Sequence, residues 1–122
     1  QATKAFMVEK SLVPPLVIDS ISIHRLRHKI KIRWTTSVDT LSSNFQVQRS
    51  TDGVQFESAG DAVPVIHSFY TQNNYFFEDK ISSLKKIYYR LETINKKGIN
   101  QYSPVVILDP NKSDITWKNI QG

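Results

Sequence analysis

The chain has 122 residues, of which 39% are hydrophobic and 22% charged, as expected for one soluble globular domain with a single core. It contains no cysteine, which excludes disulfide bonds and thiolate metal sites. No apolar run approaches the roughly 20 residues of a membrane helix, so we expect no membrane span. Sixteen Lys and Arg residues against eleven Asp and Glu residues give a net charge of +5, which suits an anionic partner but is also ordinary for a basic soluble protein.

The N-terminal residues 1–15 lack a sustained hydrophobic period and end in Pro14 and Pro15, which indicates an arm or linker. Because the chain starts with Gln1 rather than Met, we expect a mature chain that has lost its signal peptide, the alternative being a trimmed chain. From Leu16 onward the apolar residues begin to alternate with polar ones.

Period-two alternation predicts a series of strands. The second of these strands, residues 29–36, has Ile and Trp side chains on one face and Lys and Arg side chains on the other. One face is therefore expected to be buried and the other solvated. The predicted strands cover residues 16–23, 29–36, 44–50, 54–60, 74–79, 87–95 and 99–108.

The C-terminal part of the chain carries two further signals. Pro104 cannot donate to a strand ladder, so the strand at 99–108 is expected at a sheet edge. Residues 109–122 are polar apart from Ile115, Trp117 and Ile120, and we interpret them as a C-terminal tail.

Residues 44–56 read NFQVQRSTDGVQF, in which two alternating runs flank the polar group STDG. Asp-Gly between such runs is a strong hairpin signal, because Gly tolerates a positive φ and Asp bonds nearby backbone. We therefore predict that Thr51, Asp52 and Gly53 form the tip of a structural turn rather than a reactive loop.

The strands are not interrupted by a convincing amphipathic helix or by βαβ alternation. This favours an all-β fold, an antiparallel sandwich of about seven strands, over a parallel nucleotide-binding sheet.

Five blocks follow one another along residues 16–108: IRWTTSVD, NFQVQRSTDGVQF, NYFFED, IYYRLETINKKG and QYSPVV. In this order they resemble a fibronectin type III-like (immunoglobulin-like) domain, of the variant found in exported multidomain proteins of bacteria with type IX secretion. The resemblance implies an antiparallel sandwich, an architectural role, and a periplasmic, cell-surface or secreted location. The sorting domain that often ends such proteins is not recognisable in residues 109–122.

The expected core combines the strand pattern with this resemblance. The period-two pattern gives one set of inward positions, and the match to the family pattern places Tyr75 and Phe77 inward as well. The predicted core residues are Trp34, Phe45, Val47, Phe56, Tyr75, Phe77, Tyr89 and Leu91.

The sequence offers little for catalysis or for metal binding. Its three histidines, His24, His28 and His67, lie in or beside connections, and no serine has the surroundings of a nucleophile elbow. Glu78 and Asp79 are adjacent on a strand and so face opposite ways, which does not suit a pair of glycosidase carboxylates. We therefore expect no catalytic residue, no metal ligand and no cofactor.

The stretch HRLRHKIKIR, residues 24–33, holds the densest positive charge of the chain. One interpretation is a stripe that binds phosphate or sulfate groups of an anionic polymer or nucleic acid. The other, which we favour, is the solvated face of the second strand, where Lys also discourages association between sheets. The residues concerned are Arg25, Arg27, Lys29, Lys31 and Arg33.

A second candidate is a mixed polar and aromatic surface on the outer face of the larger sheet, which suits a partner contact. It is formed by Gln46, Gln48, Phe76, Tyr88, Arg90 and Glu92. Exposed rings at Phe76, Tyr88 or Trp117 would alternatively stack on sugars.

The sequence thus predicts a non-catalytic module that provides spacing, presentation or protein–protein contact. A carbohydrate-binding module and an anion or nucleic-acid binder are the alternatives, with protein the favoured partner, polysaccharide next and nucleic acid last. Neither the oligomeric state nor the identity of a ligand follows from the sequence.

Overall fold

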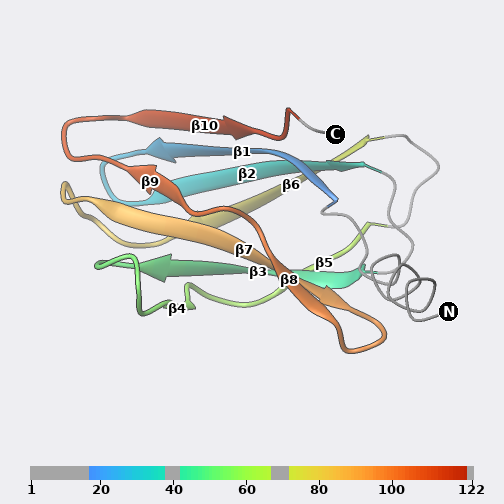
Figure 1. Cartoon of the computed structure of the whole chain (residues 1–122). Coiled ribbons are helices and arrows are strands. Elements are labelled where there is room, and N and C mark those ends of the chain that lie inside the picture. Colours follow the sequence, from blue (N-terminus) through green and yellow to red (C-terminus); the bar gives the residue numbers. More distant parts are fainter. Residues whose placement is uncertain (1–16, 38–41, 67–71, 121–122) are drawn as a thin grey trace, which may run out of the picture.

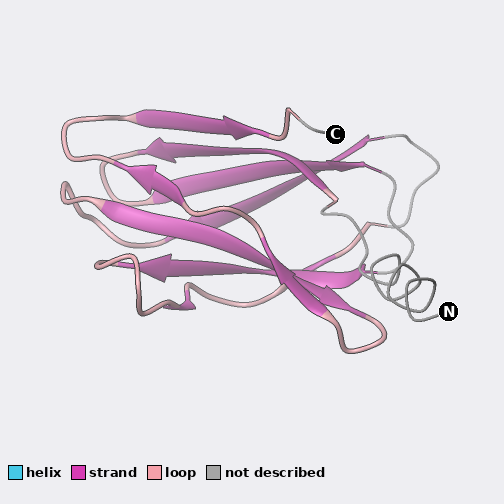
Figure 2. Cartoon of the chain, viewed as in Figure 1, coloured by secondary structure: helices cyan, strands magenta, loops and turns pink. Residues whose placement is uncertain are grey.

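The computed structural model describes residues 17–37, 42–66 and 72–120, which form two antiparallel sheets and, within these ranges, no helix (Figures 1 and 2). The expected N-terminal arm, His67 and most of the loop after the second strand lie outside the described residues. The strands are β1 (Ile18–Arg25), β2 (Ile30–Ser37), β3 (Ser42–Ser50), β4 (Glu57–Ser58), β5 (Val63–Pro64), β6 (Gln72–Asp79), β7 (Ile87–Asn95), β8 (Asn100–Tyr102), β9 (Val106–Leu108) and β10 (Asp114–Lys118).

One sheet has four strands in the order β10-β1-β2-β6, and the other has six. In the six-stranded sheet the order is β4-β3-β7-β8, with β5 also paired to β3 and β9 also paired to β7. The chain passes from β2 to β3, returns to the first sheet for β6, and then crosses back to β7. This alternation between sheets packs two inward faces against each other, and the prediction of an all-β sandwich is confirmed.

The core lies between the sheets and is centred on three aromatic rings. Trp34 of β2 stacks on Tyr75 of β6, with 5.7 Å between ring centroids, and Phe45 of β3 meets Tyr75 at 4.9 Å from the opposite sheet. Such offset and tilted ring pairs stabilise a core beyond the area that they bury. Aliphatic side chains, five of them Ile from β1 and β2, fill the space around them. The expected core positions Trp34, Phe45, Val47, Tyr75, Tyr89 and Leu91 are all buried, and Phe77 packs against them half-buried.

Phe56 was expected in the core but does not lie there, because the strand predicted over residues 54–60 is much shorter than expected. Only Glu57 and Ser58 pair with β3, and Val54 is exposed. The backbone N–H groups of Val54 and Gln55 donate to the Asp52 carboxylate at 2.8 and 2.9 Å, which holds them away from the ladder. Phe56 consequently emerges on the outer face of the six-stranded sheet instead of in the core.

The segment interpreted as a C-terminal tail contains a strand. β10 pairs antiparallel with β1, placing Trp117 opposite Ile21 and Ile115 opposite Ile23. Trp117 packs half-buried against the core and so completes the four-stranded sheet. In the six-stranded sheet, Pro104 lies between β8 and β9, the two strands at the edge beside β7, and divides the expected strand 99–108 into two short ones.

Candidate interaction surfaces

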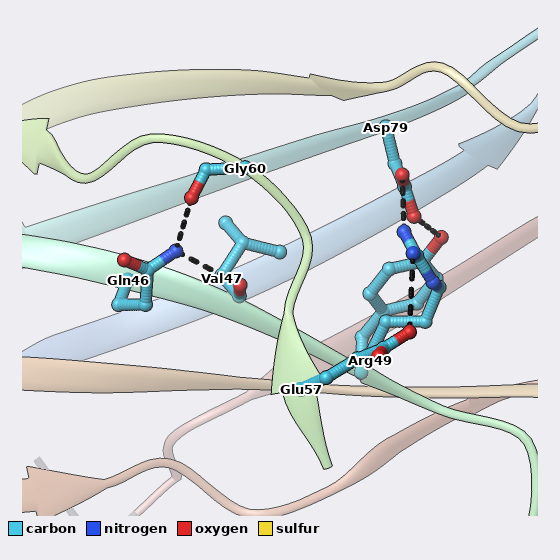
Figure 3. Close-up of polar contacts among 7 residues, drawn as sticks. Gln46, Val47, Arg49, Glu57, Gly60 and Asp79 are labelled. Atoms are coloured by element: carbon cyan, nitrogen blue, oxygen red, sulfur yellow. Dashed lines mark hydrogen bonds and ion pairs between the residues drawn. The ribbon is translucent and has the colours of Figure 1, made fainter.

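A polar contact joins the two sheets at the end of β6. The Asp79 carboxylate accepts a hydrogen bond of 2.5 Å from Arg49 Nη1 of β3 and one of 2.6 Å from the Tyr89 hydroxyl of β7. Asp79 is only 1% exposed, and the second side of the Arg49 guanidinium lies 3.4 Å from Glu57 (Figure 3). A buried carboxylate is stable only when it is paired in this way.

These contacts fix the protonation states of Arg49 and Tyr89. Burial, the hydrogen bond to Asp79 and the charge of Asp79 together raise the pKa of the Tyr89 hydroxyl far above its ordinary value. Burial disfavours the charged form of Arg49, but the hydrogen bond and the charge of Asp79 outweigh it and raise the pKa of the guanidinium. Tyr89 therefore stays protonated and Arg49 charged, which makes this a structural link between the sheets.

Sequence reasoning missed this link, although one signal was present. Side chains alternate along a strand, so Arg49 lies on the same face of β3 as the inward residues Phe45 and Val47. Its charged side chain must therefore face the core. A charge at an inward position requires a buried partner. The partner, Asp79, lies 30 residues further along the chain in the other sheet, and local alternation carries no information about it.

The structure brings together five of the six residues of the predicted partner face. Gln46 and Gln48 of β3 lie directly opposite Glu92 and Arg90 of β7, and Tyr88 follows on the same outer face. Arg90 Nε donates to Gln48 Oε1 at 2.6 Å. Gln46 Nε2 donates to the Gly60 carbonyl at 2.8 Å, as Figure 3 shows.

Two aromatic rings that sequence reasoning did not place here complete this face. The Arg90 guanidinium carbon lies 4.2 Å from the ring centroid of Phe56 and 4.2 Å from that of Tyr102, so the cation is held between two rings. The Tyr102 ring remains 49% exposed. We call Phe56, Arg90 and Tyr102 the Arg90 stack. The strand pattern could have suggested Tyr102, whereas Phe56 was assigned to the core.

Phe76, the sixth predicted residue of the partner face, lies on the other sheet. It stands on the outer face of β6, opposite Arg33 of β2, whose guanidinium carbon is 5.9 Å from the ring centroid. The prediction that it joins the five residues above is wrong, because β6 pairs with β2 and not with β3 or β7. Its ring is 61% exposed and borders a shallow depression lined also by Ser22, His24, Lys31, Arg33 and Glu78.

A row of ionisable side chains crosses the same face of the four-stranded sheet. Asp114, His24, Lys31 and Glu78 stand opposite one another on β10, β1, β2 and β6. His24 Nδ1 is hydrogen-bonded to Asp114 Oδ1, and this bond lowers the pKa of the Asp114 carboxyl. The hydrogen bond from Lys29 Nζ, 2.9 Å long, likewise lowers the pKa of Glu78.

The predicted basic stripe is divided by the fold. Lys31 and Arg33 lie on the solvated sheet face, as the structural interpretation of this stretch expected, and Lys29 is paired with Glu78. Arg25 instead donates to the backbone carbonyls of Ser83, Lys85, Asp109 and Lys112. Arg27 lies in the connection between β1 and β2. The five cations therefore do not form one continuous binding stripe.

Thr51, Asp52 and Gly53 lie in the connection between β3 and β4, where the turn was expected. Ser50 Oγ accepts from the N–H groups of Asp52 and Gly53, and Gly53 has φ +79°, a conformation that favours glycine. Backbone N–H donation, mainly from Gln55 and Val54, lowers the pKa of the Asp52 carboxyl. The side chains of Ser50 and Asp52 thus hold the turn.

Among the described residues, no group of three or more His, Asp or Glu side chains is placed to hold a metal ion. In the same residues no helix is long and apolar enough to cross a membrane. Comparison of the chain with protein-family models finds no match, and comparison with curated protein sequences finds none either.

Proposed function

We propose that this chain is a fibronectin type III-like module of an exported protein, periplasmic, secreted or displayed at the cell surface. The strand order supports this, since the second strand of a fibronectin type III-like sandwich is an inner strand of the smaller sheet, and β2 lies between β1 and β6. The strand number also supports it. If β8 and β9 are counted as one interrupted strand, and β5 and β10 as additions to the sandwich, the ten strands reduce to the seven expected.

The module acts by protein–protein contact through the outer face of its six-stranded sheet, without catalysis. The Arg90 stack is the observation that carries this proposal. Arg and Tyr are the side chains most enriched at the energetic centres of interfaces. Here two rings and the amide of Gln48 already hold the Arg90 guanidinium in one position, so less side-chain entropy is lost when a partner binds.

A photoreactive phenylalanine analogue in place of Tyr102 tests the proposal in cells that naturally produce the protein. The matched control carries the analogue in place of Phe76, an exposed ring that also lies beside an Arg but on the other sheet. We expect a discrete protein adduct from position 102 and none from position 76. Adducts from position 76 alone, or none from position 102, would contradict the proposal.

Carbohydrate binding is the second candidate, and one observation favours it. The exposed Phe76 ring borders a depression whose rim carries carboxylate, imidazole and ammonium groups, which suit sugar hydroxyls. A glycan array probed with the wild type and with Phe76→Ala decides the question. Binding that disappears in Phe76→Ala would establish a sugar site, and a blank array beside a working lectin control would remove this candidate.

A further inference from the structure

The first and last described strands, β1 and β10, are neighbours, and both ends of the described chain lie at one end of the sandwich. β10 runs antiparallel to β1, with Lys118 opposite Ser20, and the Asn119 N–H donates to the Asp19 carbonyl at 2.8 Å. The described chain therefore enters and leaves the sandwich at the same end. We call the opposite end, at the left in Figure 1, the distal end; it consists of the connections 26–29, 51–56, 80–86 and 109–113.

Arg25 fastens the connections of the distal end to one another. Its guanidinium donates to carbonyl groups of two connections, those of Ser83 and Lys85 in one and of Asp109 and Lys112 in the other. The Ser82 hydroxyl donates to the Arg27 carbonyl at 3.0 Å and so attaches the β1–β2 connection. Planar Arg is suited to such multiple donation. These three connections thus form a rigid surface.

Positive charge is concentrated at the distal end. Its four connections contain six Lys and Arg residues and two Asp residues, an excess of four, compared with +5 for the whole chain. Asp109 lies 3.9 Å from Lys86, and Lys29 is paired with Glu78, but Arg27, Lys80, Lys85 and Lys112 form no ion pair within 4.0 Å among the described residues.

Two strongly exposed aliphatic side chains lie in the connections of the distal end. Leu84, directly before Lys85 and Lys86, is 79% exposed, and Val54 of the β3–β4 connection is 78% exposed. Aliphatic side chains of this size gain nothing from a soluble polyanion, whereas the boundary between lipid headgroups and acyl chains accommodates both them and basic side chains.

We propose that the distal end docks end-on onto an anionic lipid surface. Lys85, Lys86, Lys112 and Arg27 face headgroup phosphates, and Leu84 enters the acyl boundary. The first and last described strands meet at the opposite end of the sandwich, where Ser20 of β1 lies opposite Lys118 of β10. The residues proposed to meet the lipid, Leu84 and these four cations, share no residue with the Arg90 stack, and their role does not depend on the function proposed above.

Vesicle sedimentation tests the proposal, with the intact chain, phosphatidylcholine vesicles, and vesicles that also contain phosphatidylglycerol. We expect binding only to the anionic vesicles and a decrease with salt. The double variant Lys85→Glu/Lys86→Glu is expected to lose about tenfold or more in partition coefficient, since each basic residue near such a surface contributes about 1 kcal/mol. Leu84→Asp should weaken binding while leaving the cations in place.

The matched controls are Lys96→Glu/Lys97→Glu and Ile99→Asp, which alter an exposed lysine pair and an exposed aliphatic residue at the opposite end. They should bind anionic vesicles as the wild type does. Equal binding to both vesicle types, or equal losses in the variants and their controls, would overturn the proposal. A third result would also overturn it: dextran sulfate that binds the protein, competes fully with the anionic vesicles and is bound equally well by Leu84→Asp. That result would identify a soluble polyanion as the ligand.

Discussion

The Tyr89 hydroxyl of β7 donates a 2.6 Å hydrogen bond to the Asp79 carboxylate of β6, and this bond connects the two sheets through the core. Arg49 of β3 binds the other oxygen of the same carboxylate. The sandwich therefore depends on a buried polar contact as well as on its apolar core.

Replacement of Asp79 by Asn should strongly destabilise the fold. It removes the negative charge that compensates the largely buried Arg49 guanidinium, and breaking a buried pair in this way costs about 3 kcal/mol or more in the free energy of unfolding. Chemical denaturation measures this loss. Glu78→Gln, at the exposed neighbouring position, is the control and should cost far less. Equal costs for the two variants would show that the link contributes little.

Tyr89→Phe should lose stability at neutral pH, and the loss should shrink in alkaline solution. The folded-state pKa of Tyr89 is raised, so the folded protein retains a proton that the unfolded chain releases above about pH 10. The contribution of Tyr89 is therefore fully present below pH 10 and decreases as the pH rises further. Denaturation of wild type and variant from pH 8 upward measures the difference. A difference that stays constant or grows above pH 10 would contradict the assignment.

Gly53→Ala should destabilise the protein more than Gly98→Ala. Both glycines have positive φ, +79° and +83°, so both substitutions carry a backbone cost of about 1–2 kcal/mol. Only at Gly53 would the added Cβ also lie 2.9 Å from the Tyr88 ring, whereas at Gly98 nothing lies within 4 Å. Thermal denaturation of the two variants isolates the contribution of the ring contact. If Gly98→Ala is equally or more destabilising, Tyr88 does not constrain the turn.

Arg25→Lys should loosen the distal end without unfolding the sandwich. The three nitrogens of the Arg25 guanidinium donate to four backbone carbonyl groups, which the single nitrogen of a lysine ammonium cannot reach together. Amide exchange in residues 80–86 and 109–113 should increase about tenfold or more, as expected for the loss of charge-assisted hydrogen bonds. Arg27→Lys, a conservative change in the same region, should leave exchange there unchanged. Unaltered exchange in Arg25→Lys would mean that other contacts hold these connections.

Much of the fold could be predicted from the sequence because period-two alternation is strong in β2, β3 and β7. In each of these strands the expected inward residues, such as Trp34, Val47 and Leu91, are buried. β10 was not predicted, because five residues with two apolar side chains look like a tail until the free edge of β1 is known.

The candidate surfaces could be predicted only in part. Gln48 and Arg90 were assigned to one sheet face because side chains alternate between the two faces along a strand. In the structure they lie opposite each other. Phe76 and Phe56 were misplaced for different reasons. The position of Phe76 depends on which sheet β6 joins. The position of Phe56 depends on the Asp52 carboxylate, which accepts hydrogen bonds from the two residues before Phe56 and so keeps them from pairing with β3. Neither property is encoded in local alternation.

In the function that we propose, Arg90 directs a protein contact on the six-stranded face. The decisive measurement is the yield of the photo-adduct formed from position 102 in three backgrounds: otherwise wild type, Arg90→Ala and Arg33→Ala. Arg33 is the matched control, since it also lies beside an exposed ring but on the other sheet. We expect the adduct to be lost in Arg90→Ala and unchanged in Arg33→Ala. An adduct that survives Arg90→Ala, in a variant that denatures like the wild type, would contradict the claim.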